Sequence, residues 1–180
     1  MKQLLRVHGI EKRVNINTVI VRGVPQFVAE KLEQFNGRRQ LHHEYFMQAA
    51  IKEVPQAQYE TAMMLEKGLG CIQNFSEAAF WYEEAAKRGN IDAFNNLGAM
   101  FKEGRGVHQD YKKAFILFSK AAQAGNAKAQ FNLGAMYDMG LGCEENKEKA
   151  IEWCRKAAYQ GHQMAKDIIK RMQNDGQIVF

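Results

Sequence analysis

The chain of 180 residues is 46% hydrophobic and 25% charged, which is ordinary for a globular protein able to bury a core without disulfides or metal. Two prolines and fifteen glycines exclude the disordered and collagen-like classes. No stretch approaches about 18 consecutive apolar residues, and residues 1–14 lack the apolar core of a signal peptide, so we expect a cytoplasmic protein without a membrane span.

The N-terminal segment 1–24 lies in the most basic third of the chain. Residues 1–56 hold nine Lys or Arg and five Asp or Glu, so most of the net charge of +5 belongs to this third. Seven of the nine basic residues are the ones around which the excess is centred: Lys2, Arg6, Lys12, Arg13, Arg22, Arg38 and Arg39. Such a segment can attract RNA or another anionic surface, although it lacks the dense basic stripe typical of nucleic-acid binders. Alternation over 14–21 indicates a short strand, and the segment is also compatible with disorder.

Residues 25–54 have the spacing of a degenerate helical repeat. The pair Ala49-Ala50 precedes the pair Ala85-Ala86 by 36 residues, which is the period found further along the chain. Asn and Gly favour a turn between helices. We therefore expect two helices with a break between them: 27–35, then Asn36-Gly37, then 38–52.

A period of 36 residues governs the sequence from 55 to 162. Small residues that recur at a fixed step are the usual sign of a repeat architecture. Three sets of glycines carry the period: Gly68, Gly104 and Gly140; Gly70, Gly106 and Gly142; Gly89, Gly125 and Gly161. The period divides this region into three units, 55–90, 91–126 and 127–162.

Each unit shows the pattern of two helices joined by a Gly-x-Gly loop. In 91–126 the first helix is predicted by an apolar stripe at helical spacing: Ala93, Leu97, Met100 and Phe101. Gly104 suits the left-handed residue that ends a helix. Asp110 suits the N-cap of the second helix, as do Asn74 and Asn146 in the other units. The second helix has its own apolar face, formed by Ala114, Phe115, Phe118, Ala121 and Ala122.

Gly98 and Gly134 stand inside the first helices of their units. A helix-interior glycine costs about 1 kcal/mol relative to alanine, and it is tolerated where two helices approach so closely that a Cβ would clash. A two-helix unit cannot bury its apolar face alone, so neighbouring units must stack. The sequence therefore predicts an all-α fold, a right-handed α/α superhelix or solenoid.

Two runs in the last unit resemble the Sel1-like repeat, a relative of the tetratricopeptide repeat. They are Ala129-Gln130-Phe131-Asn132-Leu133-Gly134-Ala135-Met136-Tyr137 with its Gly140-Leu141-Gly142 loop, and Lys149-Ala150-Ile151-Glu152-Trp153 with Lys156-Ala157-Ala158. The 36-residue period favours this family over the tetratricopeptide repeat of about 34 residues. The resemblance covers about 57–162 and implies an adaptor or scaffold built as an α/α superhelix.

Residues 163–180 are expected to form a C-terminal capping helix and tail. The segment 163–174 has the spacing of a first helix without its partner. Lys166, Lys170 and Arg171 give it the polar outer face expected of a cap. The tail Ile178-Val179-Phe180 is apolar, and the sequence leaves its role open.

No catalytic or metal-binding constellation is visible in the sequence. The Gly-x-Gly triplets follow helices and lack the strand and third glycine of a dinucleotide-binding fingerprint. His42-His43-Glu44 lacks metal-ligand spacing, because adjacent residues point to different faces of a helix. His108 and His162 are expected to be solvated loop residues. We expect no cofactor, no metal and no enzymatic activity.

Cys71, Cys143 and Cys154 are an odd number of cysteines without metal-ligand spacing. Free thiols are the expected state, with a Cys143–Cys154 disulfide as the alternative. Cys154 stands where the other units have Tyr82 and Phe118, which predicts a buried thiol. The carboxylates after Cys143 would disfavour its thiolate.

The first helices of such units line a concave face, and their positions outside the packing stripe are the candidate protein-binding residues. Aromatic and Met side chains are enriched in interface cores, although these could instead pack against neighbouring helices. The candidates are Tyr59, Met63, Glu66, Asn95, Ala99, Lys102, Phe131, Ala135, Asp138 and Met139.

The sequence thus favours a non-enzymatic scaffold whose concave groove binds another protein or a peptide. One particular form, suggested by the family resemblance, is an immunity protein that neutralises a bacterial toxin or effector. A less favoured alternative is an RNA or anionic-surface binder that uses the basic N-terminal segment.

Overall fold

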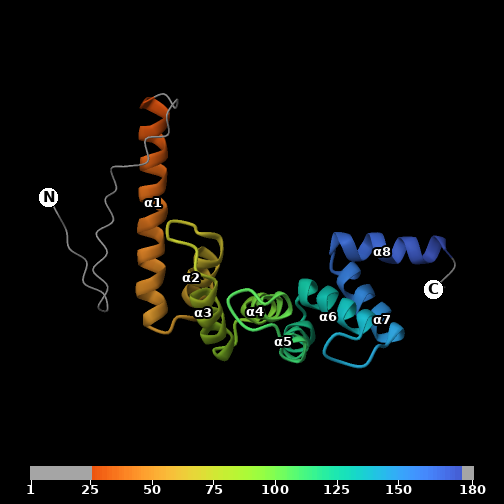
Figure 1. Ribbon diagram of the computed structural model, residues 1–180. Helices are drawn as coiled ribbons and strands as arrows, with labels where there is room; N and C mark the ends of the chain where they lie inside the picture. Colours follow the sequence, from red (N-terminus) through yellow and green to blue (C-terminus); the bar gives the residue numbers. More distant parts are fainter. Residues whose placement is uncertain (1–25, 176–180) are drawn as a thin grey trace. The chain divides into compact units, whose positions relative to one another are not determined.

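The computed structural model describes the backbone of residues 26–175 and the side chains of residues 37–175 (Figure 1). The predictions for 1–24, the strand over 14–21 included, and for Ile178-Val179-Phe180 lie outside these residues. Across the described range the regular structure is helical throughout, in the order α1 (Gln26–Ile51), α2 (Pro55–Lys67), α3 (Phe75–Lys87), α4 (Ile91–Glu103), α5 (Tyr111–Gln123), α6 (Ala127–Met139), α7 (Lys147–Tyr159) and α8 (Gln163–Asn174).

The chain divides into two units, Met1–Phe35 and Asn36–Phe180. Of the first unit only the helical backbone from Gln26 is described. In the second unit every helix from α2 to α8 packs on the next, so the pairs α2/α3, α4/α5 and α6/α7 follow one another and α8 lies on α7 (Figure 1). This arrangement is the all-α repeat superhelix expected from the 36-residue period.

The N-terminal helix differs from the prediction. We expected a turn at Asn36-Gly37, but α1 continues through both residues to Ile51. A glycine inside a helix costs only about 1 kcal/mol and keeps its backbone hydrogen bonds, whereas proline would remove one. Within the described residues the chain first turns after Ile51, where Glu53 takes the left-handed conformation (φ 63°).

The second glycine of each Gly-x-Gly loop lies in close contact with the backbone of a helix that precedes its own unit. A Cβ on Gly106 would overlap the carbonyl of Phe75, and a Cβ on Gly142 would overlap the carbonyl of Tyr111. A Cβ on Gly70 would in the same way overlap the carbonyl of Arg39 in α1. Because Arg39, Phe75 and Tyr111 are 36 residues apart, α1 from Arg39 onward occupies the place of a second helix.

The predicted helix ends are confirmed. The side chains of Asn74, Asp110 and Asn146 accept hydrogen bonds from the backbone N–H three residues later, at 3.2, 2.9 and 2.9 Å. Gly104 ends α4 in the left-handed conformation (φ 71°). The prediction that His162 is merely solvated is wrong, because its Nδ1 caps α8 by accepting from the N–H of Ala165 at 3.3 Å.

The predicted close approach at the interior glycines is also confirmed. A Cβ on Gly98 would lie 2.9 Å from the Phe118 ring, and one on Gly134 would lie 3.0 Å from the carbonyl oxygen of Ala150. Tyr82 and Phe118 fill the largest buried positions of the first two units, and Cys154 is buried at the equivalent position as predicted. Both glycines therefore allow the first helix of the unit to approach the second closely, by contact with a ring at Gly98 and with backbone at Gly134.

Candidate binding surface

The ten candidate residues lie on α2, α4 and α6, and the structure gives them three degrees of exposure. Asp138 and Met139 are exposed, and Asn95 is buried, with 7% of its surface accessible. The prediction that all ten lie outside the packing surface is therefore wrong for Asn95. The remaining seven are half-buried: Tyr59, Met63, Glu66, Ala99, Lys102, Phe131 and Ala135.

Three of the four large apolar candidates pack into the protein interior along one side. The Tyr59 ring lies 5.7 Å from the Tyr82 ring, and burial raises the pKa of Tyr59. Met63 packs against the same core cluster. Phe131 stacks on the imidazole of His162, with 4.6 Å between ring centroids. Among the four, Met139 alone is mostly exposed, at 55%.

Glu66 is the centre of a hydrogen-bonded group between the first two units. Its carboxylate accepts from the Tyr82 hydroxyl at 2.7 Å and from the Arg105 guanidinium at 2.9 Å. The Tyr82 oxygen in turn accepts from the amide of Asn96 at 3.1 Å. Burial, followed by the hydrogen bond to Glu66, raises the pKa of Tyr82 far above its ordinary value. The phenol therefore stays neutral and donates to a carboxylate that remains partly open to solvent.

The same group continues into the third unit. The Asn95 amide donates to Asn96 Oδ1 at 3.1 Å, and the Asn132 amide donates to Asn95 Oδ1 at 3.1 Å. We call the connected side chains the polar strip; it comprises Arg105, Glu66, Tyr82, Asn96, Asn95 and Asn132. The strip fixes amide and carboxylate groups across α2, α4 and α6 in one orientation.

Sequence reasoning found Glu66 and Asn95 but missed the other members of the polar strip. A signal for two of them was present, because Asn96 and Asn132 are 36 residues apart in the middle of first helices. Tyr82 gave no such signal, since its equivalents are Phe118 and Cys154. Its role depends on a hydroxyl that meets Glu66 only in the folded chain.

The three thiols are free and unremarkable as nucleophiles. Burial raises the pKa of Cys71, Cys143 and Cys154. For Cys143 the predicted direction is right, but burial is the main cause rather than the carboxylates that follow it. The alternative Cys143–Cys154 disulfide is wrong, because both sulfurs are free thiols.

Neither metal-ligand clusters nor membrane spans are found in the part of the chain that the structure describes. Over the described residues no group of three His, Cys, Asp or Glu side chains is close enough to hold an ion. His43 is half-buried, and desolvation lowers its pKa. No helix within the described range is both long and apolar enough to cross a bilayer.

Comparison with known proteins identifies the repeat. The family model of the Sel1 repeat matches residues 55–90, 91–126 and 127–162. These matches coincide with the three units given by the 36-residue period. No curated protein matches the chain at a significant level.

Solved structures of bacterial proteins share this architecture. A protective antigen with an SLR fold, present in uropathogenic Escherichia coli strains, superposes with a TM-score of 0.71 and 32% identity over 74% of this chain and 28% of its own. A Sel1 repeat protein from Oxalobacter formigenes superposes with a TM-score of 0.70 and 25% identity over 75% of this chain and 54% of its own. Helicobacter pylori cysteine rich protein B shares the fold, with a TM-score of 0.60 and 21% identity over 72% of this chain and 96% of its own.

The chain thus spans 28% of the length of the first of these proteins and 54% of the second.

Proposed function

The chain belongs to the Sel1 repeat family, whose repeats are generally protein–protein interaction modules, and from this premise we propose that it is a non-enzymatic adaptor. Its partner is another protein, held by the surface of the first helices α2, α4 and α6. Sel1 repeat scaffolds are generally non-catalytic, which supports the non-enzymatic part of the proposal.

The observation that carries the proposal is the polar strip. An Asn side chain has two N–H donors and two acceptor lone pairs, and each strip bond uses only one of these. Asn96 and Asn132 are half-buried and fixed by their neighbours, so they keep hydrogen-bonding capacity on the open side. Groups that are already ordered lose little entropy on binding, which favours recognition of a polypeptide backbone.

Met139 supplies the exposed apolar part of the surface. Met is adaptable because its unbranched side chain fits irregular partners. Ala99 and Ala135 are small, half-buried residues of α4 and α6. Together with the polar strip they form a surface of fixed polar groups next to one flexible apolar contact.

The proposal is tested by affinity capture from native lysate followed by mass spectrometry and titration of the purified partner. The test variant is Met139→Glu, and its matched control is Ile116→Glu on α5, because the two side chains are 55% and 52% exposed. We expect Met139→Glu to lose the partner and Ile116→Glu to retain it, with unchanged helicity in both. A bacterial toxin among the captured proteins would identify the adaptor as an immunity protein.

Capture that is equal in both variants would contradict the proposed surface. Capture dominated by RNA and abolished by moderate salt would instead point to the basic N-terminal third. A purified partner that binds wild type and both variants with one affinity would move the site away from α2, α4 and α6.

A further inference from the structure

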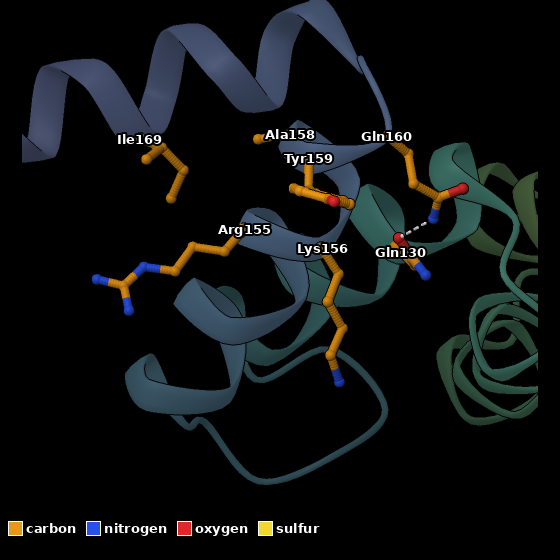
Figure 2. Close-up of a pocket in the computed structure, with 7 residues that line it drawn as sticks. All are labelled: Gln130, Arg155, Lys156, Ala158, Tyr159, Gln160 and Ile169. Carbon is orange, nitrogen blue, oxygen red and sulfur yellow. Dashed lines mark hydrogen bonds between the residues drawn. The ribbon is translucent and has the colours of Figure 1, made fainter. Parts of the chain in front are cut away.

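A second surface feature lies at the C-terminal end of the described helices, apart from the polar strip. It is a hollow of about 550 Å³ between the end of α7 and the middle of α8, with α6 at its side. Figure 2 shows Tyr159 on α7 and Ile169 on α8 facing the space between these two helices. The lining residues are Gln130, Arg155, Lys156, Ala158, Tyr159, Gln160 and Ile169.

The hollow presents an almost wholly apolar surface. Its two amide side chains are hydrogen-bonded: Gln160 donates to Gln130 at 2.8 Å, as Figure 2 shows, and Gln130 donates to the carbonyl of Ala122 at 3.2 Å. Both amides therefore have hydrogen-bond partners within the protein, and the surface that lines the hollow consists mainly of carbon atoms. A hollow of this size is in the range that holds the side chains of a short peptide.

Tyr159 is the unusual residue at this place. It is 95% exposed, whereas the equivalent positions of the other units carry Lys87 and Gln123. An exposed aromatic ring beside an apolar hollow is typical of an interface, because it supplies a large contact area with little entropy to lose. The equivalents of Ile169 in the other units are Leu97 and Leu133, so an aliphatic residue at this position is usual in the repeat. The aromatic ring of Tyr159 is what distinguishes this site from the other units.

The end of α7 and most of α8, which border the hollow, carry more basic than acidic side chains. Between 152 and 171 the chain has two acidic residues, Glu152 and Asp167, of which Glu152 pairs with Lys156 at 2.7 Å. The basic residues of the same stretch are more numerous: Arg155, Lys156, Lys166, Lys170 and Arg171, all exposed. This local excess of positive charge does not show in the total charge, because residues 57–180 taken together are nearly neutral. A cluster of this sign attracts carboxylates and steers them to the surface.

We propose that this hollow binds an acidic peptide segment of a partner protein, with an apolar side chain seated against Tyr159 and Ile169 and carboxylates facing the basic residues of α7 and α8. Charge complementarity selects this occupant over the apolar tail Ile178-Val179-Phe180 and over a second copy of the chain. The site is separate from α2 and α4, so it is a second docking site rather than part of the one proposed above.

The test uses the full chain and an array of fluorescein-labelled peptides read by fluorescence polarisation. Each peptide carries Phe, Leu or Ser at its centre, flanked on both sides by Asp and Glu, by Ser or by Lys. We expect Phe or Leu with acidic flanks to bind at least tenfold more tightly than the peptides with a Ser centre or Lys flanks. Binding of the Lys-flanked peptides with equal affinity, or of none of the peptides, would overturn the proposal.

Two pairs of variants assign the site. Tyr159→Ser should weaken the best peptide about tenfold, whereas its control Tyr111→Ser, an exposed tyrosine on α5, should not. Lys170→Glu with Arg171→Glu should weaken it further, whereas Lys112→Glu with Lys113→Glu, also exposed, should have little effect. Equal effects in variant and control would place the binding elsewhere and overturn the assignment.

A last variant tests whether the chain's own C-terminal tail, rather than a partner peptide, occupies the hollow. Ile178→Ser with Phe180→Ser in the full chain should leave the peptide affinity unchanged, and a strong gain would show that the tail is the occupant, against the proposal. Met139→Glu should bind the peptide as wild type does. Failure of the peptide site and failure of the adaptor surface are therefore separate results.

Discussion

Gly134 lies directly against the backbone of Ala150, so that a Cβ on the glycine would stand 3.0 Å from the alanine carbonyl oxygen. This contact sets the spacing of α6 and α7. A helix backbone cannot move aside as the end of a side chain can, so the glycine is required by geometry and not by flexibility.

Gly134→Leu should lower the free energy of unfolding by about 2–4 kcal/mol, because the added side chain forces α6 and α7 apart. Its control is Gly37→Leu, at a helical position where an added Cβ meets nothing within 4 Å. The control should be neutral or stabilising, since leucine is the better helix former. Urea unfolding followed by circular dichroism measures both, and equal midpoints would contradict the close approach.

Gly142→Ala should destabilise the protein more than Gly161→Ala. Both glycines have positive φ, 72° and 94°, so each alanine pays a left-handed strain of about 1–2 kcal/mol. Only the Cβ at 142 also overlaps the Tyr111 carbonyl, whereas the space at 161 is open. We expect an additional loss of about 1–3 kcal/mol at 142 from overpacking. Thermal unfolding that ranks the two variants equally would exclude a coupling role for the second loop glycine.

Tyr82→Phe should cost about 1–2 kcal/mol, because the Asn96 amide loses its acceptor and Glu66 loses one donor inside the protein. Tyr159→Phe is the control, since that hydroxyl belongs to a side chain exposed to solvent. Chemical unfolding of the two variants beside wild type gives the comparison. A Tyr82→Phe variant as stable as wild type would show that the polar strip contributes nothing to folding.

Tyr82 also predicts a dependence of stability on pH. Its pKa in the folded protein is raised above that of an unfolded tyrosine, which is about 10. The unfolded state therefore releases this proton first, so the stabilisation is complete below pH 10 and is lost as pH rises above it. Between pH 8 and pH 10.5 the free energy of unfolding should decrease less for Tyr82→Phe than for wild type. Equal decreases in the two proteins would refute the assignment.

The thiols should react slowly with iodoacetamide at pH 7.5, because burial raises the pKa of all three. Cys154 is buried and should be labelled last, only after unfolding, whereas Cys71 and Cys143 are half-buried. Peptide mass spectrometry over a time course gives the order. Labelling of Cys154 at the rate of Cys143 in the native protein would contradict its core position.

The helices between 55 and 174 were predictable because their boundaries are set by local chemistry. Asn74, Asp110 and Asn146 accept hydrogen bonds from residues three positions away, and Gly104 needs a left-handed backbone at its own position. Such signals are complete within a few residues. Gly37 misled the prediction because a glycine permits a turn without requiring one, and α1 passes through it.

The binding surface was predictable only in part, because exposure on a helix depends on what lies opposite. Asn95 is predicted on the open face, but it is buried and hydrogen-bonded to Asn96 and Asn132. Arg105 reaches Glu66 across 39 residues, a separation that no local pattern reports.

By itself the sequence determined the repeat, the family, the helix ends and the need for glycine at 98 and 134, since all of these follow from spacing and from short-range backbone geometry. Only the tertiary structure decided which polar side chains meet, that the Tyr82 hydroxyl donates to the Glu66 carboxylate, and that Tyr159 lies beside an apolar hollow. The physical reason is that these features arise where one helix packs on another, and packing brings together groups that are distant along the chain.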